Sequence, residues 1–376
     1  MNPISIVFAG DFCAIHPERL KMGTRLAGVL QSADLRCINF EGPLQRGKVE
    51  SANGMYLAQS DDSPKWIKEN GFNLVALANN HACDFGADGL IASRDAFQNL
   101  YTVGCGDGWD EAYKVKYIGI KDKVIGLLNV TSADFSSLKD EWTDAKLFGC
   151  PWVNHPSIPQ ILIEARKQCD YLIVLPHAGV EFMDVPLPEW RTRYRNFIDL
   201  GADAVIASHP HVPQGWELYK NKPIYYSLGN FVFEKETQST IPHWYSGLIV
   251  CLELQDDKIR PSHYCTLYEN DTIELDITDK SINHISQISD LLSDDMAYLQ
   301  KVNEQVQLLS KKYEGWMITS YGAFQLQPLS FKRIVRALRF LMHDHVKLKV
   351  FLHQLREEST QWVIQRAYKN KSKINR

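Results

Sequence analysis

Five short apolar segments of this sequence each end in side chains that commonly bind metal ions or transfer protons. The segments cover residues 4–9, 35–40, 74–78, 171–175 and 204–207. Continuous apolar runs of this length are typical of strands that are buried on both faces. The polar residues that follow them are, in chain order, Asp11, Glu41, Asn79-Asn80-His81, His177 and His209-Pro210-His211.

Helix-like stretches lie between these strands, at residues 64–71, 87–100, 157–169 and 189–201. Alternation of buried strands with helices predicts an α/β fold. In such folds, functional sites form at the carboxyl ends of the strands. We therefore expect the polar residues that follow the strands to lie close together.

The later part of the chain changes in character. Residues 225–233 are predicted to form one further strand with a tight turn inside it, and residues 248–254 and 263–268 to form antiparallel strands. Residues 282–313 and the apolar positions within 331–342 instead follow helical spacing. We predict a main α/β domain over residues 1–275 and a helical, basic C-terminal region over residues 280–376.

Charge is unevenly distributed along the chain. The net charge of −4 over 376 residues argues against a nucleic-acid-binding protein. From Lys332 to Arg376, however, twelve Lys or Arg face only three Asp or Glu, a net charge of +9. This tail is predicted either to pack on the main domain as an amphipathic helix or to make peripheral contact with an anionic membrane surface.

Cysteine usage and the N-terminus bear on where the protein works. None of the eight Cys forms a C-x-x-C pair, which indicates reduced thiols in a cytosolic protein. The first residues carry no basic segment, and their apolar run is too short for a signal peptide or a membrane span. We expect a cytoplasmic protein without a membrane span, with membrane contact through the basic tail as the alternative.

The polar strand ends offer a mixed set of metal ligands. In an extended segment, residues two apart point to the same side, so His209 and His211 are predicted to face one metal site. Nitrogen and oxygen ligands together suit one or two ions of Mn, Fe or Zn. A shared carboxylate can bridge two ions about 3.5–4 Å apart, and Glu41 is our candidate. The predicted ligands are Asp11, Glu41, Asn80, His177, His209 and His211.

His81 is the candidate catalytic residue. It follows Asn80 directly, and an imidazole beside bound cations can donate a proton to a leaving group. The alternative is that His81 only caps a helix.

Six ordered motifs resemble the CapA-type proteins of poly-γ-glutamate and capsule synthesis, a branch of the calcineurin-like metallophosphoesterase superfamily. They extend over roughly residues 4–235. The matching segments are Phe8-Ala9-Gly10-Asp11, Asn39-Phe40-Glu41-Gly42-Pro43, Leu77-Ala78-Asn79-Asn80-His81 with Asp84 and Gly86, His177-Ala178-Gly179-Val180-Glu181, residues 201–212, and Tyr226-Ser227-Leu228-Gly229-Asn230-Phe231.

The resemblance implies a four-layer α/β/β/α metallophosphoesterase-like sandwich with a metal site. It also implies that Glu41 bridges two ions and that His81 lies near the substrate. Asp11 and His211 would bind the first ion, and Asn80, His177 and His209 the second.

The chain departs from the classical pattern at the first metal. Cys13 stands where classical metallophosphoesterases have a histidine, and Glu41 stands where they have an aspartate. Cys13 is interpreted either as a thiolate ligand or as an ordinary buried thiol. Three further residues are candidates for orienting ligands or contacting substrate: Asn79, Glu181 and Asn230. For Glu181 the alternative is a surface carboxylate, and for Asn230 a structural role in a turn.

Two functions remain open from the sequence. The first is a metal-dependent hydrolase, phosphoesterase-like, that acts on a polymer or phosphoester substrate in capsule or exopolymer biosynthesis. The second is a non-catalytic, metal-binding protein that binds polymer or assembles the capsule machinery. The absence of the usual histidine at Cys13 favours the second function, and His81 favours the first.

Overall fold

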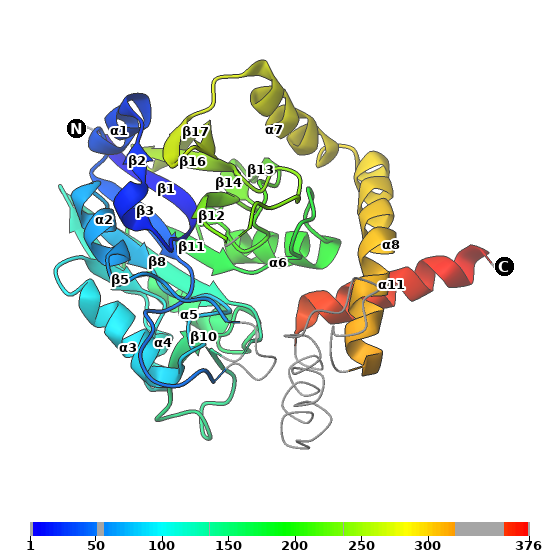
Figure 1. Ribbon diagram of the computed structural model, residues 1–376, viewed down its shortest axis with the longest axis horizontal. Coiled ribbons are helices and arrows are strands. Elements are labelled where there is room, and N and C mark those ends of the chain that lie inside the picture. The colour runs from blue at the N-terminus through cyan, green and yellow to red at the C-terminus, as the bar shows by residue number, and fades with distance from the viewer. Residues whose placement is uncertain (1–2, 51–55, 135, 236, 320–356, 375–376) are drawn as a thin grey trace.

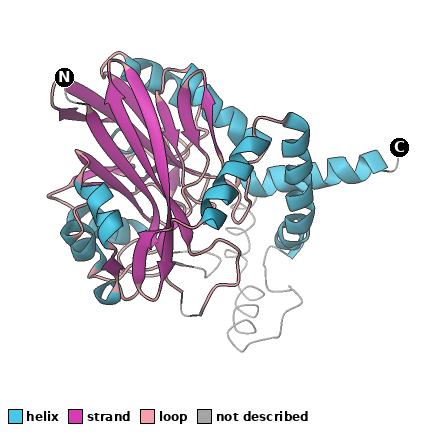
Figure 2. Ribbon diagram, turned by 90° about the horizontal axis from the view of Figure 1, so that it is seen from above, coloured by secondary structure: helices cyan, strands magenta, loops and turns pink. Residues whose placement is uncertain are grey.

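The computed structural model describes residues 3–50, 56–134, 136–235, 237–319 and 357–374. Two large β-sheets form the centre of the molecule, and helices surround them (Figures 1 and 2). The predicted α/β/β/α sandwich with a helical C-terminal region is confirmed.

The first sheet has nine strands in the order β2-β18-β17-β16-β1-β3-β4-β5, and β15 also pairs with β1. β1, β3, β4 and β5 run parallel, whereas β16, β17 and β18 form the antiparallel half. The strands are β1 (Ile4–Cys13), β2 (Lys21–Met22), β3 (Leu35–Phe40), β4 (Leu74–Ala76), β5 (Tyr101–Val103), β15 (Asn230–Phe233), β16 (Ser246–Gln255), β17 (Lys258–Glu269) and β18 (Thr272–Leu275).

The second sheet has six strands in the order β13-β14-β12-β11-β8-β7, with β8, β11, β12 and β14 parallel. Its strands are β7 (Lys116–Ile120), β8 (Lys123–Thr131), β11 (Tyr171–His177), β12 (Ala204–Ile206), β13 (Trp216–Tyr219) and β14 (Lys222–Tyr225). A small third sheet consists of β6 (Gly106–Asp107), β9 (Ser137–Leu138) and β10 (Phe148–Pro151).

Three apolar clusters define the four layers. Between the sheets, Phe8 of β1 shares a cluster with Leu127 of β8 and Ile173 of β11. A second cluster joins the outer face of the first sheet to α1, α2 and α3, and a third joins the second sheet to α5 and α6. The helices are α1 (Thr24–Gln31), α2 (Ser63–Glu69), α3 (Gly86–Ala96), α4 (Trp109–Ala112), α5 (Ile158–Arg166) and α6 (Pro188–Asp199), with a 3₁₀ turn η1 (Pro17–Arg19).

The sequence of α6 shows why these segments are helical. Pro188 occupies the first turn, where its missing N–H is not needed. Trp190, Tyr194, Phe197 and Ile198 are buried at helical spacing, so they form one apolar stripe against the second sheet.

Two predicted strands differ from the structure. Residues 225–233 do not form one strand: β14 ends at Tyr225 in the second sheet, and β15 begins at Asn230 in the first. The residues between them cross from one sheet to the other. β1 does not end before Asp11 but continues to Cys13.

The C-terminal region contains α7 (Asp279–Leu291), α8 (Asp295–Thr319) and α11 (Glu358–Ile374). Of the basic tail, residues 357–374 are described. Val363 and Ala367 of α11 are buried in the cluster that includes α6, so this part packs on the main body. The helix predicted from spacing within residues 331–342 lies outside the described residues. None of the helices in the described ranges is long and apolar enough to cross a membrane.

Candidate metal centre

Strand ends from both sheets meet at one edge of the sandwich. β1 and β3 lead to Asp11 and Glu41, while β11 and β12 lead to His177 and the turn at residues 209–211. The backbone N–H of His209 donates to Asp11 Oδ2 at 3.2 Å, which joins the two sheets directly. The gathering of these residues follows the sequence prediction.

A bulge in β1 places Asp11. The register between β1 and β3 shifts between Ala9 and Asp11, and bulges commonly re-aim a side chain. A Cβ atom on Gly10 would lie 2.0 Å from the carbonyl oxygen of Gly229. Only glycine therefore allows β1 to pass this close to the crossover between the sheets.

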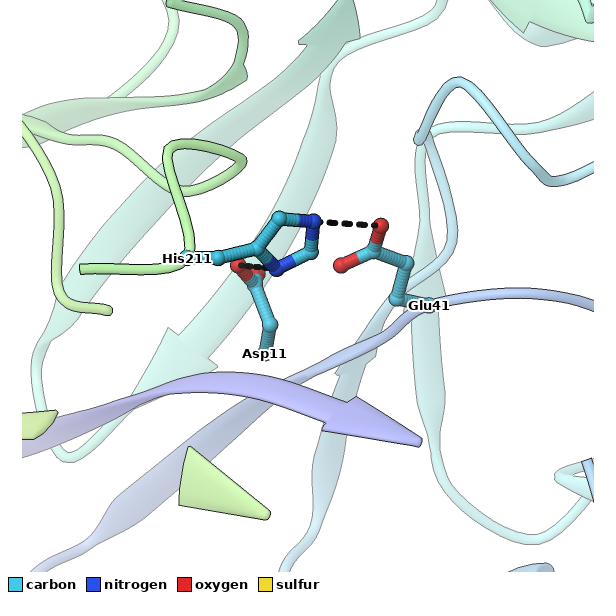
Figure 3. Close-up of side chains that lie close together, drawn as sticks. All are labelled: Asp11, Glu41 and His211. Carbon is cyan, nitrogen blue, oxygen red and sulfur yellow. Dashed lines mark ion pairs between the residues drawn. The ribbon is translucent and has the colours of Figure 1, made fainter. Parts of the chain in front are cut away.

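Asp11, Glu41 and His211 form a buried group whose ligand atoms all lie within 4.8 Å of one another (Figure 3). The ring of His211 lies between the two carboxylates. Its Nδ1 is 3.7 Å from Asp11 Oδ2, and its Nε2 is 3.7 Å from Glu41 Oε1. These donors could hold a divalent ion.

Glu41 also faces a second histidine. His177 Nε2 lies 3.8 Å from Glu41 Oε1 and 2.9 Å from Asn80 Oδ1. One carboxylate oxygen of Glu41 is thus about equally distant from His177 and His211. A carboxylate in this position could be shared by two ions, and the bridging role of Glu41 stays a prediction.

Several buried polar atoms at the centre have no hydrogen-bond partner within the described part of the chain. They are both carboxylate oxygens of Glu41 and Nδ1 of His209. Unpaired buried polar groups are costly, and a cation held by the group of Asp11, Glu41 and His211 would satisfy the Glu41 oxygens. The donor set, carboxylate oxygens with imidazole nitrogens, therefore fits a divalent ion such as Mn, Fe or Zn.

Burial also shifts the proton affinities at the centre. It raises the pKa of Asp11 to about 7, and burial together with the charge of Asp11 raises the pKa of Glu41 well above its ordinary value. Burial lowers the pKa of His211 to about 3 and that of His177 well below its usual range. The imidazoles are thus neutral, the form that binds metals.

The turn that carries the paired histidines is not the extended segment that we predicted. The φ angles of His209 and His211 are 102° and 62°. Residues other than glycine rarely adopt positive φ angles. The bend lets the backbone N–H of His209 reach Asp11. The expectation that spacing alone would align both rings is therefore wrong, although both residues do border the centre.

Two asparagines orient the ligands. Asn39 Nδ2 donates to Asp11 Oδ1 at 2.8 Å and lies 3.1 Å from His177 Nδ1. Asn230 Oδ1 lies 3.0 Å from His211 Nδ1. The sequence prediction included Asn230 but missed Asn39, although Asn39 stands in the motif that ends at Glu41.

His81 lies at the partly open rim of the centre, with 22% of its side chain exposed. Its Nδ1 is 2.6 Å from Asp84 Oδ2. Burial works against the charged form of His81, but the carboxylate of Asp84 outweighs it and raises the pKa. Asn79 Oδ1 accepts from the backbone N–H of His81 at 3.1 Å and of Gly42 at 3.3 Å, so Asn79 fixes this loop. His81 precedes α3, which begins at Gly86, and does not cap it.

Cys13 is not part of the group formed by Asp11, Glu41 and His211. It belongs to an apolar cluster with Phe233 and Trp244. Burial raises the pKa of its thiol, which disfavours a thiolate. The structure favours the buried-thiol interpretation over the ligand interpretation.

Glu181 is half-buried beside the centre. Its negative charge opposes the effect of burial on the pKa of His209 and His211. The charge of Glu181 therefore influences the pKa values of both histidines. Its role as an orienting partner stays a prediction.

Two capsule or PGA biosynthesis proteins are similar to this chain in amino-acid sequence. The PGA biosynthesis protein CapA of Bacillus subtilis is 32% identical over 55% of this chain and 55% of its own length. The capsule biosynthesis protein CapA of Bacillus anthracis is 29% identical over 55% of this chain and 52% of its own. The chain thus matches about half the length of these relatives.

Among solved structures, a candidate 5′-nucleotidase from Staphylococcus aureus aligns with a TM-score of 0.42 at 16% identity, over 77% of this chain and 59% of that one.

The family model described as "Bacterial capsule synthesis protein PGA_cap" matches residues 16–235, which is more than half of the 376 residues. The match includes every predicted ligand except Asp11, which lies five residues before it. This chain belongs to the PGA_cap family of bacterial capsule synthesis proteins.

Proposed function

We propose that this protein is a divalent-metal-dependent hydrolase that acts on a phosphoester in capsule or exopolymer biosynthesis. One observation carries the proposal: the buried carboxylate of Glu41 has no hydrogen-bond partner among the described residues, although it lies within 4 Å of both His177 and His211. A structural glutamate would be expected to have hydrogen-bond donors. A carboxylate left unpaired between two neutral imidazoles is instead typical of a metal ligand.

The ligands divide into two sets. We assign Asp11 and His211 to one ion and Asn80 and His177 to the other, with Glu41 shared between them; the supporting contacts are His211 with Asp11 and His177 with Asn80. We assign His209 to the second set because its Nδ1 has no hydrogen-bond partner among the described residues. When bound, a divalent ion would lower the pKa of a water ligand and stabilise charge on a phosphoryl oxygen.

The chain's own residues keep these donors in position. Asn39 holds the Asp11 carboxylate, and Asn230 holds the His211 ring through its Nδ1. The carbonyl oxygen of Asn230 accepts a hydrogen bond from His211 Nδ1, which leaves His211 Nε2 for a ligand role.

His81 is the proposed proton donor. With Nδ1–H donated to Asp84, the proton available to a leaving group is the one on Nε2. The raised pKa keeps this imidazole protonated more fully near neutral pH than a free histidine. Its partial exposure lets it face substrate, in contrast to the buried ligands.

Replacing His81 tests this proposal. His81→Asn should keep the fold and most of the metal but lose about 10²–10⁴-fold in the rate of aryl phosphate ester hydrolysis with Mn²⁺. The matched control is His16→Asn, because the side chain of His16 is 49% exposed and its ring pairs only with Glu18. Full activity in His81→Asn would remove His81 from the mechanism.

A second candidate function is metal-dependent binding of a polymer without catalysis. The observation that favours it is Cys13, which lies in an apolar cluster where a further ligand would be expected. Wild-type protein that holds metal but hydrolyses no ester in a panel of aryl phosphates would support binding and reject phosphoester hydrolysis.

A further inference from the structure

The first turn of the C-terminal helix α11 contacts two loops that border the metal centre. α11 lies outside residues 16–235, the range of the family match. Figure 1 shows it crossing α8, and the views in Figures 1 and 2 agree that the two helices lie together. The contacts are made by Glu358 and Ser359, which are both buried.

α11 is held firmly against the main body. The ring of Trp362 packs edge-on against that of Trp190 in α6, with centroids 5.0 Å apart. Further along the helix, Arg366 Nε lies 2.9 Å from both carboxylate oxygens of Glu189. The first turn of α11 is therefore a fixed support for whatever it touches.

Ser359 supports the loop that follows the ligand His177. Trp190 Nε1 donates to Ser359 Oγ at 3.0 Å, and the Ser359 hydroxyl donates to the carbonyl oxygen of Gly179. Gly179 in turn packs on Pro210: a Cβ atom there would lie 2.8 Å from Pro210 Cγ. Ser359 is thus two contacts away from the turn that carries both paired histidines.

A backbone hydrogen bond joins the same loop to the same turn. The N–H of Phe182 donates to the carbonyl oxygen of Pro210 at 2.9 Å. Displacement of Gly179 would therefore be passed to Pro210 both through packing and through this hydrogen bond.

Glu358 supports the second loop. Its Oε2 accepts from the backbone N–H of Ala133 at 3.1 Å, and its Oε1 accepts from Trp152 Nε1 at 2.6 Å and Asn154 Nδ2 at 2.9 Å. The neighbouring N–H of Ser132 donates to the carbonyl oxygen of His177 at 3.2 Å. The carboxylate of Glu358 therefore anchors the strand end that pairs with His177.

The supported segments need this support because their backbone is strained. Phe182, His209 and His211 all have positive φ angles, at 67°, 102° and 62°. Such conformations are unfavourable and persist only where the surrounding structure imposes them. Neighbouring contacts on the loops are therefore part of what fixes the ligand geometry.

We propose that Ser359 and Glu358 are positioning residues for the metal centre, so that the C-terminal helix sets the geometry of His177, His209 and His211. The inference rests on the proposed metal centre. It also makes a claim about the metal-free protein, namely that residues 178–183 and 207–212 are held in place by α11.

Metal affinity and geometry give the first test, with Co²⁺ as the probe. Ser359→Ala should weaken Co²⁺ binding about 10–100-fold, as loss of groups that orient ligands commonly does, and should change the visible spectrum of the bound ion. Ser359→Thr keeps the hydroxyl, so it should retain both the Co²⁺ affinity and the visible spectrum of wild type. Arg366→Gln is the matched control: it loosens the same helix without touching either loop, so it should lower the melting temperature but leave affinity and spectrum unchanged.

Hydrogen exchange in metal-free protein gives the second test. Amides of residues 207–212 should exchange faster in Ser359→Ala than in Arg366→Gln. Glu358→Gln, which removes the charge but little volume, should give the corresponding effect at residues 131–134 if Ser359→Ala fails to fold. Equal exchange in these variants and Arg366→Gln would overturn the positioning role. Absence of Co²⁺ binding by wild type would instead overturn the proposed metal centre, and exchange alone would then decide the positioning role.

Discussion

Two glutamates in this molecule, one fully buried and one largely buried, have opposite surroundings. Glu217 in β13 accepts from Arg191 at 2.7 Å, from Arg195 at 2.6 and 2.7 Å, and from the Tyr226 hydroxyl at 2.6 Å. Glu41 has no hydrogen-bond partner on either oxygen within the described residues.

Their pKa values move in opposite directions for this reason. Although burial opposes it, the hydrogen bonds from Arg195, Arg191 and Tyr226 lower the pKa of Glu217 to about 2, whereas burial and Asp11 raise that of Glu41. Burial alone therefore does not distinguish a structural carboxylate from a functional one. The presence or absence of hydrogen-bond donors from the protein does distinguish them. Removing the charge of Glu217 and that of Glu41 in turn tests this comparison.

The largest expected effect on stability is at Glu217. Glu217→Gln leaves Arg195 without this counter-ion and Arg191 with Asp295, whose carboxylate is 3.7 Å away. Breaking a largely buried ion pair in this way costs up to about 3–5 kcal/mol of unfolding free energy. Glu41→Gln in metal-free protein should cost nothing or stabilise, because it removes a buried carboxyl that has no hydrogen-bond donor among the described residues. Urea denaturation of both variants measures the difference.

The control is Glu253→Gln. Its carboxylate pairs with Arg260 at 2.9 Å on the surface, and exposed pairs contribute about 0–1 kcal/mol. Equal losses for Glu217→Gln and Glu41→Gln would contradict the distinction between the two buried glutamates.

A smaller effect is expected in the pH dependence of stability. The folded-state pKa of Asp11, about 7, lies above its ordinary value of 3.8. At Asp11 the folded state therefore binds more protons between these values, so the contribution of Asp11 to the unfolding free energy of metal-free protein falls as pH rises from about 4 to 7. His177 and His211, whose pKa values are lowered, contribute in the opposite direction. Urea denaturation with chelator present should therefore show the fall as a decreasing difference in unfolding free energy between wild type and Asp11→Asn across this range.

The contribution of Glu217 to the pH dependence of stability has the opposite sign. Because its folded-state pKa lies below the ordinary value of 4.5, its contribution is complete above that value and is lost as pH falls toward about 2. A difference in unfolding free energy between wild type and Asp11→Asn that rises through pH 4–7 in metal-free protein would contradict the surroundings assigned to Asp11.

The smallest effect on metal binding is expected at Cys13. Cys13→Ser should retain wild-type metal content, because the thiol packs against Phe233 and Trp244 and is not part of the group formed by Asp11, Glu41 and His211. It should still lower the unfolding free energy by about 1–3 kcal/mol through a buried, poorly paired hydroxyl. Metal analysis after purification decides: a larger metal loss in Cys13→Ser than in Glu41→Gln would restore the thiol as a ligand.

The sequence was sufficient for the parts of the fold that local pattern encodes. Apolar runs located β3, β4, β11 and β12 within a few residues, because strands buried on both faces have a continuous apolar signature. The pattern could not show that residues 225–233 divide between two sheets. A crossover is fixed by tertiary packing at Gly10 and Gly229, which are 219 positions apart.

The candidate site likewise contains residues that the local sequence identifies and residues that only the tertiary structure reveals. Ligand-type residues after strands were found because their residue types are chemically distinctive. Asn39 was missed because an asparagine has many structural uses. The contact of Ser359 with Gly179 joins residues 180 positions apart, and no local spacing predicts it.

The most direct test of the central claim is a calorimetric titration of chelator-treated protein with Mn²⁺. We predict that wild type binds one or two equivalents, and that Glu41→Gln loses at least about 100-fold in affinity, since loss of an orienting group alone costs about 10–100-fold. Glu217→Gln should bind as wild type does wherever it is folded. Wild-type protein that binds no Mn²⁺, or Glu41→Gln protein that binds it with unchanged affinity, would contradict the account.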